Sequence, residues 1–141
     1  MNTEYLIKVI DFWNLSVKRN DFYPRELISK IDTRSKEVVD IVGPRRSGKS
    51  TLLKLIIRNI LQSKDFLYIN FEDPFFIQNR EAQVIEALLD TYTEYFEKNL
   101  RFVFFDEIQN IENWENSIRK LRDGTNYKIF LNYLRNKQPT R

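Results

Sequence analysis

The stretch DIVGPRRSGKSTLLKLI, residues 40–56, joins a β-branched run to a leucine-rich run through a loop that contains glycine. It holds Gly43 and Gly48, two of only three glycines in the 141-residue chain. Residues 43–50 fit the pattern G-x-x-x-x-G-K-[ST] in full. Glycine lets the backbone curl so that successive N–H groups point at one anion, and the N-terminus of the following helix favours negative charge. The stretch therefore predicts a loop that holds the phosphates of a nucleotide.

The loop residues have separate expected roles. Lys49 is expected to reach the β- and γ-phosphates, and the Ser50 hydroxyl to coordinate Mg²⁺. Arg45 and Arg46 have two interpretations, contact with a phosphate or a partner, or simple solvation on the loop surface. The candidate nucleotide ligands from the pattern are Gly43, Pro44, Arg45, Arg46, Ser47, Gly48, Lys49 and Ser50.

A second motif, FVFFDE at residues 102–107, is an apolar run that ends in two carboxylates. In a parallel sheet both carboxylates would emerge at the ligand edge, where Asp106 can hold Mg²⁺ through its water shell. Glu107 is the candidate base for an attacking water, because the chain has no histidine. The other interpretations of this pair are a solvated acidic turn and an N-cap for the next helix. The guanine-reading pattern N-K-x-D is incomplete at residues 136–139, which disfavours GTP.

Composition limits the remaining possibilities. Hydrophobic residues make up 42% of the chain and charged residues 30%, which is typical of a globular protein. The absence of cysteine and histidine excludes disulfides, thiolate zinc sites and Ser-His catalysis. The net charge of +3 permits nucleic-acid contact, but no recognition motif supports it. Neither a signal peptide nor a membrane-spanning run is recognisable, so a cytoplasmic protein is expected.

The order of expected elements indicates an α/β fold. Strands are expected at residues 37–42, 66–71, 101–105 and 127–133. Helices are expected at residues 4–17, 24–31, 50–61, 81–98 and from 114 to about 124. Alternating strands and helices favour a mainly parallel sheet with helices on both faces, a three-layer α/β/α arrangement. We expect a helical lead-in at residues 1–35 and a nucleotide-binding P-loop domain at residues 36–141.

These motifs together resemble the archaeal and bacterial ATPases of the AAA-like "archaeal ATPase" group, within the AAA+/STAND branch of P-loop proteins. The resemblance runs from about residue 23 to about residue 130. It rests on YPREL (23–27), GPRRSGKSTLL (43–53), YINFEDP (68–74) and FFDEIQNIENWE (104–115). It implies that Lys49, Ser50 and Thr51 bind nucleotide and Mg²⁺, that Asp106 binds Mg²⁺, and that Glu107 activates water.

The resemblance also implies a sheet order of 5-1-4-3-2, but no segment of this chain corresponds to the fifth strand or to the lid that usually follows it. The strand that leads into the phosphate loop would then lie at a sheet edge, open to self-association or to a partner chain that completes the sheet. Asn132, at the tip of the fourth strand, is either a polar sensor of the nucleotide or an ordinary strand-end asparagine. Glu72 and Asp73 lie in a family-like segment that is equally well explained as a strand-ending turn.

The sequence thus predicts an ATP-binding protein that uses Mg²⁺ and hydrolyses ATP slowly if at all. The alternatives are a non-catalytic nucleotide-binding remnant that acts as an interaction module, and part of a DNA-linked motor.

Overall fold

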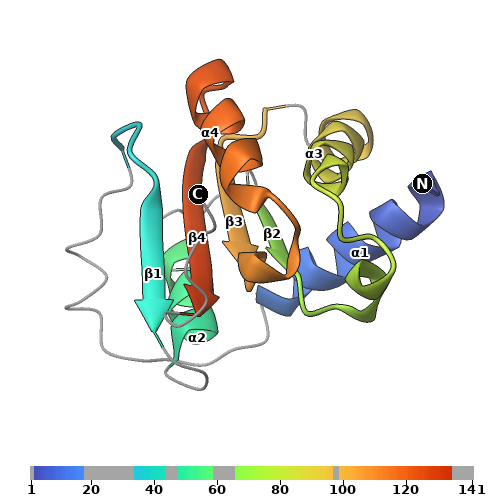
Figure 1. Ribbon diagram of the computed structural model, residues 1–141, viewed down its shortest axis with the longest axis horizontal. Helices are drawn as coiled ribbons and strands as arrows, with labels where there is room; N and C mark the ends of the chain where they lie inside the picture. Colours follow the sequence, from blue (N-terminus) through green and yellow to red (C-terminus); the bar gives the residue numbers. More distant parts are fainter. Residues whose placement is uncertain (1, 18–33, 44–47, 59–65, 97–98, 135–141) are drawn as a thin grey trace.

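The computed structural model describes residues 2–17, 34–43, 48–58, 66–96 and 99–134. Four parallel strands form one sheet in the order β1-β4-β3-β2 (Figure 1). This confirms the α/β class and the expected order of the first four strands. The strands are β1 (Val39–Gly43), β2 (Phe66–Asn70), β3 (Phe102–Asp106) and β4 (Lys128–Leu134).

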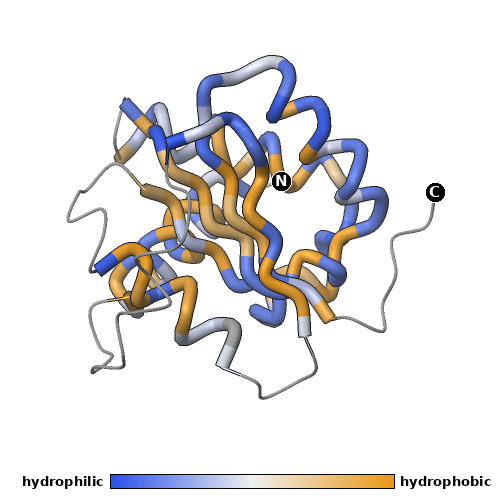
Figure 2. Tube along the Cα trace, turned by 90° about the vertical axis from the view of Figure 1, so that its left-hand side faces the viewer, coloured by the Kyte–Doolittle hydropathy of each residue, from blue (hydrophilic) through white to orange (hydrophobic). Residues whose placement is uncertain are grey.

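Helices cover both faces of the sheet, as the alternating pattern predicts (Figure 1). One face packs against α2 (Lys49–Ile56), and the opposite face packs against α3 (Gln83–Tyr95) and α4 (Trp114–Gly124). Strand residues alternate between these two cores. Phe104 and Phe130 stack at 4.5 Å on the α2 face, whereas Val103 and Phe105 join the larger core beneath α3 and α4. In Figure 2 the strands are accordingly among the most hydrophobic parts of the chain.

The N-terminal helix α1 (Thr3–Ser16) packs beside β2 and α3, and its Leu6, Val9 and Ile10 enter the larger core. Asn14 fastens it to the outer side of β2. The Asn14 Nδ2 donates to the Phe66 carbonyl at 3.0 Å, and the Tyr68 N–H donates to Asn14 Oδ1 at 2.8 Å. One side chain therefore satisfies a donor and an acceptor that face away from β3, which blunts this edge of the sheet.

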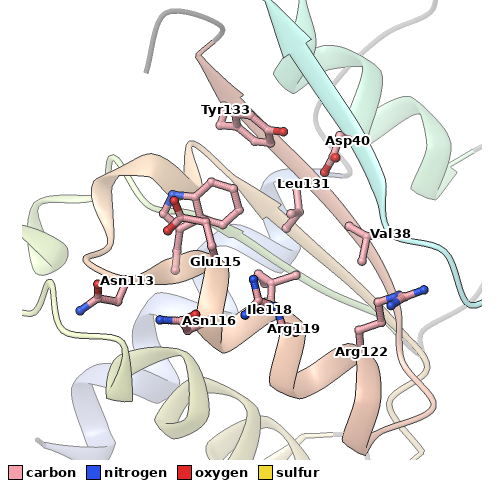
Figure 3. A pocket seen from close by; sticks show the side chains of 11 residues that line it. Val38, Asp40, Asn113, Glu115, Asn116, Ile118, Arg119, Arg122, Leu131 and Tyr133 are labelled. Atoms are coloured by element: carbon pink, nitrogen blue, oxygen red, sulfur yellow. The ribbon is translucent and has the colours of Figure 1, made fainter. Parts of the chain in front are cut away.

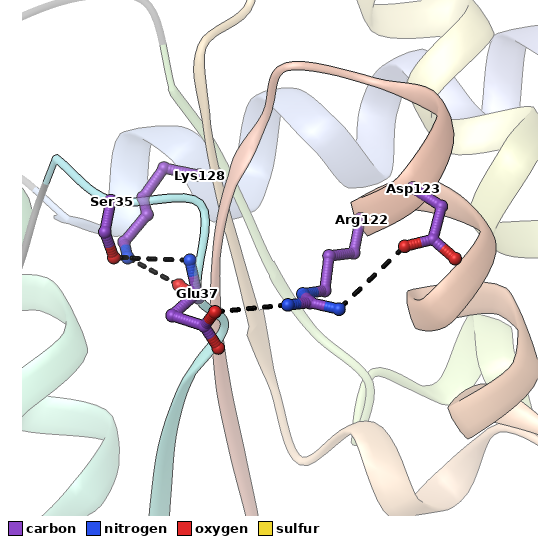
Figure 4. Close-up of polar contacts among 5 residues, drawn as sticks. All are labelled: Ser35, Glu37, Arg122, Asp123 and Lys128. Atoms are coloured by element: carbon purple, nitrogen blue, oxygen red, sulfur yellow. Dashed lines mark hydrogen bonds and ion pairs between the residues drawn. The ribbon is translucent and has the colours of Figure 1, made fainter.

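The beginning of β1 is held by side chains from two neighbouring elements (Figure 4). The Lys128 Nζ, on a residue that is only 5% exposed, donates to the Glu37 carbonyl at 2.5 Å. The Glu37 carboxylate pairs with Arg122 at 3.1 Å. Because a side chain takes the Glu37 carbonyl, the strand begins at Val39 and not at residue 37 as expected.

Two short 3-10 helices, η4 (Pro74–Ile77) and η5 (Ile108–Asn110), follow β2 and β3 and were not expected. Asp73 caps η4 by accepting from the Phe75 N–H at 2.9 Å, and it also accepts from Trp13 Nε1 at 2.9 Å. The expected helix at residues 24–31 and the YPREL segment lie outside the described residues. Within the described ranges, no helix has the length and apolar character needed to cross a bilayer.

Candidate functional site

Strand β1 ends at Gly43 and helix α2 begins at Lys49, so the pattern-bearing loop lies between a strand and a helix as expected. Gly48 is the N-cap of α2 with φ of 86°, a left-handed conformation that favours glycine. A Cβ there would meet no atom within 4 Å, so backbone conformation and not crowding calls for glycine. Gly48 makes no side-chain cap on α2, and the N-terminus of a helix favours an anionic ligand.

The structure describes the remaining loop candidates only from Lys49 onward. Pro44, Arg45, Arg46 and Ser47 lie outside the described residues. Lys49 is described only as the first residue of α2. Ser50 and Thr51 follow it in the first turn and are both partly buried.

Asp106, the last residue of β3, lies on the α2 face with no exposed surface. The Tyr68 hydroxyl donates to its Oδ2 at 2.5 Å, and Asn132 Nδ2 donates to its Oδ1. The Ser50 hydroxyl also hydrogen bonds to this carboxylate. A carboxylate that is buried and held by three donors is not a solvated acidic turn, so that interpretation fails for Asp106.

The electrostatics of Asp106 favour a cation at this point. Burial raises the pKa of Asp106 above 3.8, and hydrogen bonds from Tyr68 and Ser50 lower it in part. The nearby Glu107 raises this pKa further, and Lys54 on α2 lowers it. The ionised carboxylate is thus costly in the metal-free protein and would be stabilised by a bound cation.

The oxygen atoms around Asp106 suit Mg²⁺. Asn132 Nδ2 donates to the Asp106 carboxylate, which the Ser50 hydroxyl also contacts. Within the described residues, the Asn132 Oδ1 is buried without a hydrogen-bond partner. No cluster of three or more acidic or imidazole or thiol side chains occurs in the described part of the chain. Mg²⁺ prefers oxygen ligands, and proteins hold it through one or two side chains plus substrate phosphates, so the Ser50 hydroxyl and the Asp106 carboxylate suit it.

Glu107 follows directly in a left-handed conformation, with φ of 57° and ψ of 43°. Its residue is 8% exposed, and its Oε2 accepts from Gln109 Nε2 at 2.6 Å. The Asn110 side chain donates to the Glu107 carbonyl at 3.2 Å. Glu107 occupies the N-cap position of η5, but its side chain makes no capping bond. Left-handed non-glycine residues cost about 1–3 kcal/mol, and in the described part of the chain Glu107 and Asn113 both have this conformation.

The structure thus brings Ser50, Asp106 and Asn132 together, and Glu107 adjoins them along the chain. Tyr68 and Gln109 were not predicted from the sequence to be site residues. The sequence pattern cannot distinguish a tyrosine inside an apolar strand from an ordinary core residue. For Gln109, the only sequence signal for a contact with Glu107 is the two-residue spacing between them. Glu72 is exposed and Asp73 caps η4, in agreement with the strand-ending turn.

A cavity of about 690 Å³ lies on the opposite face of the sheet, between β1, β4 and α4 (Figure 3). Trp114, Ile118 and Leu131 give it an apolar wall, and Arg119 and Arg122 line it from α4. Asp40 also lines it, accepts a hydrogen bond from Tyr133, and has a pKa raised by burial. The sheet separates this cavity from Asp106, so it is not part of the candidate nucleotide site.

The chain matches one protein family and is similar to two archaeal proteins. A family described as an AAA domain matches residues 35–132. The uncharacterized protein MJ1544 of Methanocaldococcus jannaschii is 38% identical over 96 residues, which are 64% of this chain and 20% of that protein. The uncharacterized ATP-binding protein MJ1659 of the same organism is 33% identical over 88 residues, 57% of this chain and 24% of that protein.

The chain therefore spans only about a fifth to a quarter of the length of the curated relatives it matches. Among solved structures, C. elegans PCH-2 is similar over 92% of this chain and 35% of its own, with a TM-score of 0.44 and 18% sequence identity.

Proposed function

The chain belongs to the AAA domain family, and from that premise we propose that it binds Mg-ATP at residues 43–51 and hydrolyses it slowly. The observation that carries the proposal is that Ser50, the last residue of the phosphate-binding pattern, and Asn132 both contact the Asp106 carboxylate at the start of α2. The matching relative MJ1659 is named an ATP-binding protein, which supports the choice of nucleotide.

Each residue has a defined task in this proposal. The loop N–H groups and Lys49 bind the phosphates, and the hydroxyl of Ser50 with the carboxylate of Asp106 holds Mg²⁺. When bound, Mg²⁺ neutralises charge that develops on the phosphates. Asn132 donates to the Asp106 carboxylate, and its buried Oδ1, which has no hydrogen-bond partner among the described residues, can accept from a water or from another bound donor. Glu107, which keeps one carboxylate oxygen beyond its bond to Gln109, orients a water and accepts its proton.

The same premise extends to domain organisation and partners. We assign the nucleotide-binding domain to residues 36–141, with residues 1–35 as a lead-in whose α1 docks on the β2 side of the sheet. Strand β1 lies at the outer end of the described strand order. In the described part of the chain, no strand pairs with the side of residues 39–42 that faces away from β4. A further strand, from a second copy or from a partner chain, is proposed to pair there.

Calorimetric titration with ATP and with GTP, each with Mg²⁺, tests the proposal. We expect ATP to bind more tightly than GTP, and Lys49→Ala to weaken Mg-ATP binding at least about tenfold, because it removes a cation that contacts the phosphates. Lys120→Ala is the matched control, since Lys120 is an exposed lysine on α4 that pairs with Glu86. Unchanged affinity in Lys49→Ala would mean that the loop has no nucleotide role, and equal affinities for ATP and GTP would refute the preference.

A further inference from the structure

Tyr68 lies at the centre of β2 with no exposed surface, on the face of the sheet that packs against α2. It pairs with Phe104 in the parallel register, and Asn70 pairs with Asp106. The tyrosine ring is long enough to span this two-residue offset, and its hydroxyl reaches Asp106 Oδ2 at 2.5 Å. A residue from the middle of β2 thus contacts the carboxylate at the tip of β3.

The contacts around Asp106 come from both neighbouring strands. Asn132 on β4 donates to one carboxylate oxygen, and Tyr68 on β2 donates to the other. The Ser50 hydroxyl approaches from α2. With a donor on each oxygen, rotation of the carboxylate about its Cβ–Cγ bond would break at least one charge-assisted hydrogen bond.

Tyr68 is itself held in place from three sides. Its backbone N–H is bonded to Asn14 on α1. The Trp13 ring meets the Tyr68 ring edge-on at a centroid distance of 6.2 Å, and Lys54 Nζ on α2 lies 5.5 Å from the ring centroid. The hydroxyl therefore has little freedom to move, which is what a group that orients another residue requires.

We propose that Tyr68 is a positioning residue of the Mg-nucleotide site, whose hydroxyl fixes the Asp106 carboxylate in the orientation that faces Ser50 and the metal. This inference rests on the proposed function. It predicts that the Tyr68 hydroxyl increases the gain in ATP affinity that Mg²⁺ brings. The affinity for ATP without Mg²⁺, which the phosphate loop supplies, should not depend on this hydroxyl.

Tyr68→Phe tests this with the ring retained and only the hydroxyl removed. ATP affinity is measured by calorimetry in Mg²⁺ and again in EDTA, for the parent chain and for the variant. We expect the affinity in EDTA to stay within about twofold and the gain from Mg²⁺ to fall roughly tenfold, the usual effect of one charge-assisted hydrogen bond. Tyr92→Phe is the matched control, because Tyr92 is a 2%-exposed tyrosine on α3, across the sheet.

A double-mutant cycle with Asp106→Asn asks whether the hydroxyl acts through Asp106. If it does, adding Tyr68→Phe to Asp106→Asn changes the Mg²⁺-dependent gain no further. Independent, additive losses would overturn the inference. So would an unchanged gain in Tyr68→Phe, an equal loss in Mg²⁺ and EDTA, or a Tyr68→Phe chain that fails to fold while Tyr92→Phe folds. A parent chain without Mg²⁺-dependent ATP binding would instead refute the proposed function itself.

Discussion

Asn14→Ala is expected to lower the free energy of unfolding by about 2–3 kcal/mol. The substitution removes two hydrogen bonds, one of 3.0 Å to the Phe66 carbonyl and one of 2.8 Å from the Tyr68 N–H. Each net bond is worth about 0.5–1.5 kcal/mol, and partly buried backbone groups left without a partner add to the loss. Since α1 covers these groups, water reaches them only if the helix shifts.

The expected change in melting temperature follows from chain length. An unfolding entropy of about 2.1 cal/mol/K per residue gives roughly 0.3 kcal/mol/K for this chain. The melting temperature should therefore fall by about 7–10 °C. Urea denaturation followed by circular dichroism gives the free energy directly, with an unchanged m-value if unfolding stays two-state.

Asn116→Ala is the matched control for this loss. Asn116 is an exposed asparagine on α4, so its replacement gains the same helix propensity without removing a contact to a strand. The difference between the two variants isolates the bonds to β2. If Asn14→Ala is as stable as Asn116→Ala, the anchoring of α1 by this side chain is refuted.

Three further predictions concern the site and the sheet edge. Glu107→Gln should keep Mg-ATP binding and reduce any turnover by about 10²–10⁴-fold, because glutamine cannot take the proton; a variant as active as the parent would reassign the base. Asp106→Asn should raise the melting temperature in EDTA at neutral pH, because burial raises the pKa of Asp106 above 3.8 in the folded state. A carboxyl whose pKa is raised in the folded state destabilises the fold once the pH rises above that folded-state pKa. The gain in melting temperature from Asp106→Asn should therefore shrink as the pH falls toward 4. A gain that does not change with pH would contradict this. Sedimentation with and without Mg-ATP should show self-association through the side of β1 that pairs with no strand in the described part of the chain, and a monomer at all concentrations would refute it.

Much of the fold was predictable because apolar runs fix where strands and helices form. The order of the first four strands, which the family resemblance implied, is confirmed. The ends of the helices and strands differ from expectation by a few residues, for local reasons. Strand β3 extends to Asp106, one residue beyond its apolar run, because the Asp106 carbonyl still accepts from the Phe71 N–H at 2.8 Å. Its side chain is polar, so hydropathy alone excluded it from the strand.

The position of α1 was not predictable from its pattern. Its apolar spacing indicated a packing helix, and α1 does place Leu6, Val9 and Ile10 in the core. The contact that orients it on β2 comes from Asn14, a polar residue next to the apolar stripe. The periodicity of a helix does not indicate which strand the Asn14 side chain contacts. That contact depends on the order of the strands and on which edge strand the helix packs against.

In the candidate site, too, the sequence indicated which residue types take part but not how all of them are arranged. Sequence spacing identified Ser50 and Asp106 through the chemistry of phosphate and metal, but it left Asn132 with two interpretations. In the structure Asn132 lies on the strand next to that of Asp106 and donates to the Asp106 carboxylate, and its buried Oδ1 has no partner among the described residues. An ordinary strand-end asparagine would be solvated or fully bonded. This oxygen, on a side chain that contacts a buried carboxylate, therefore favours the sensor interpretation. A hydrated cation would suit both groups, because it brings positive charge to the carboxylate and hydrogen-bond donors to the amide oxygen.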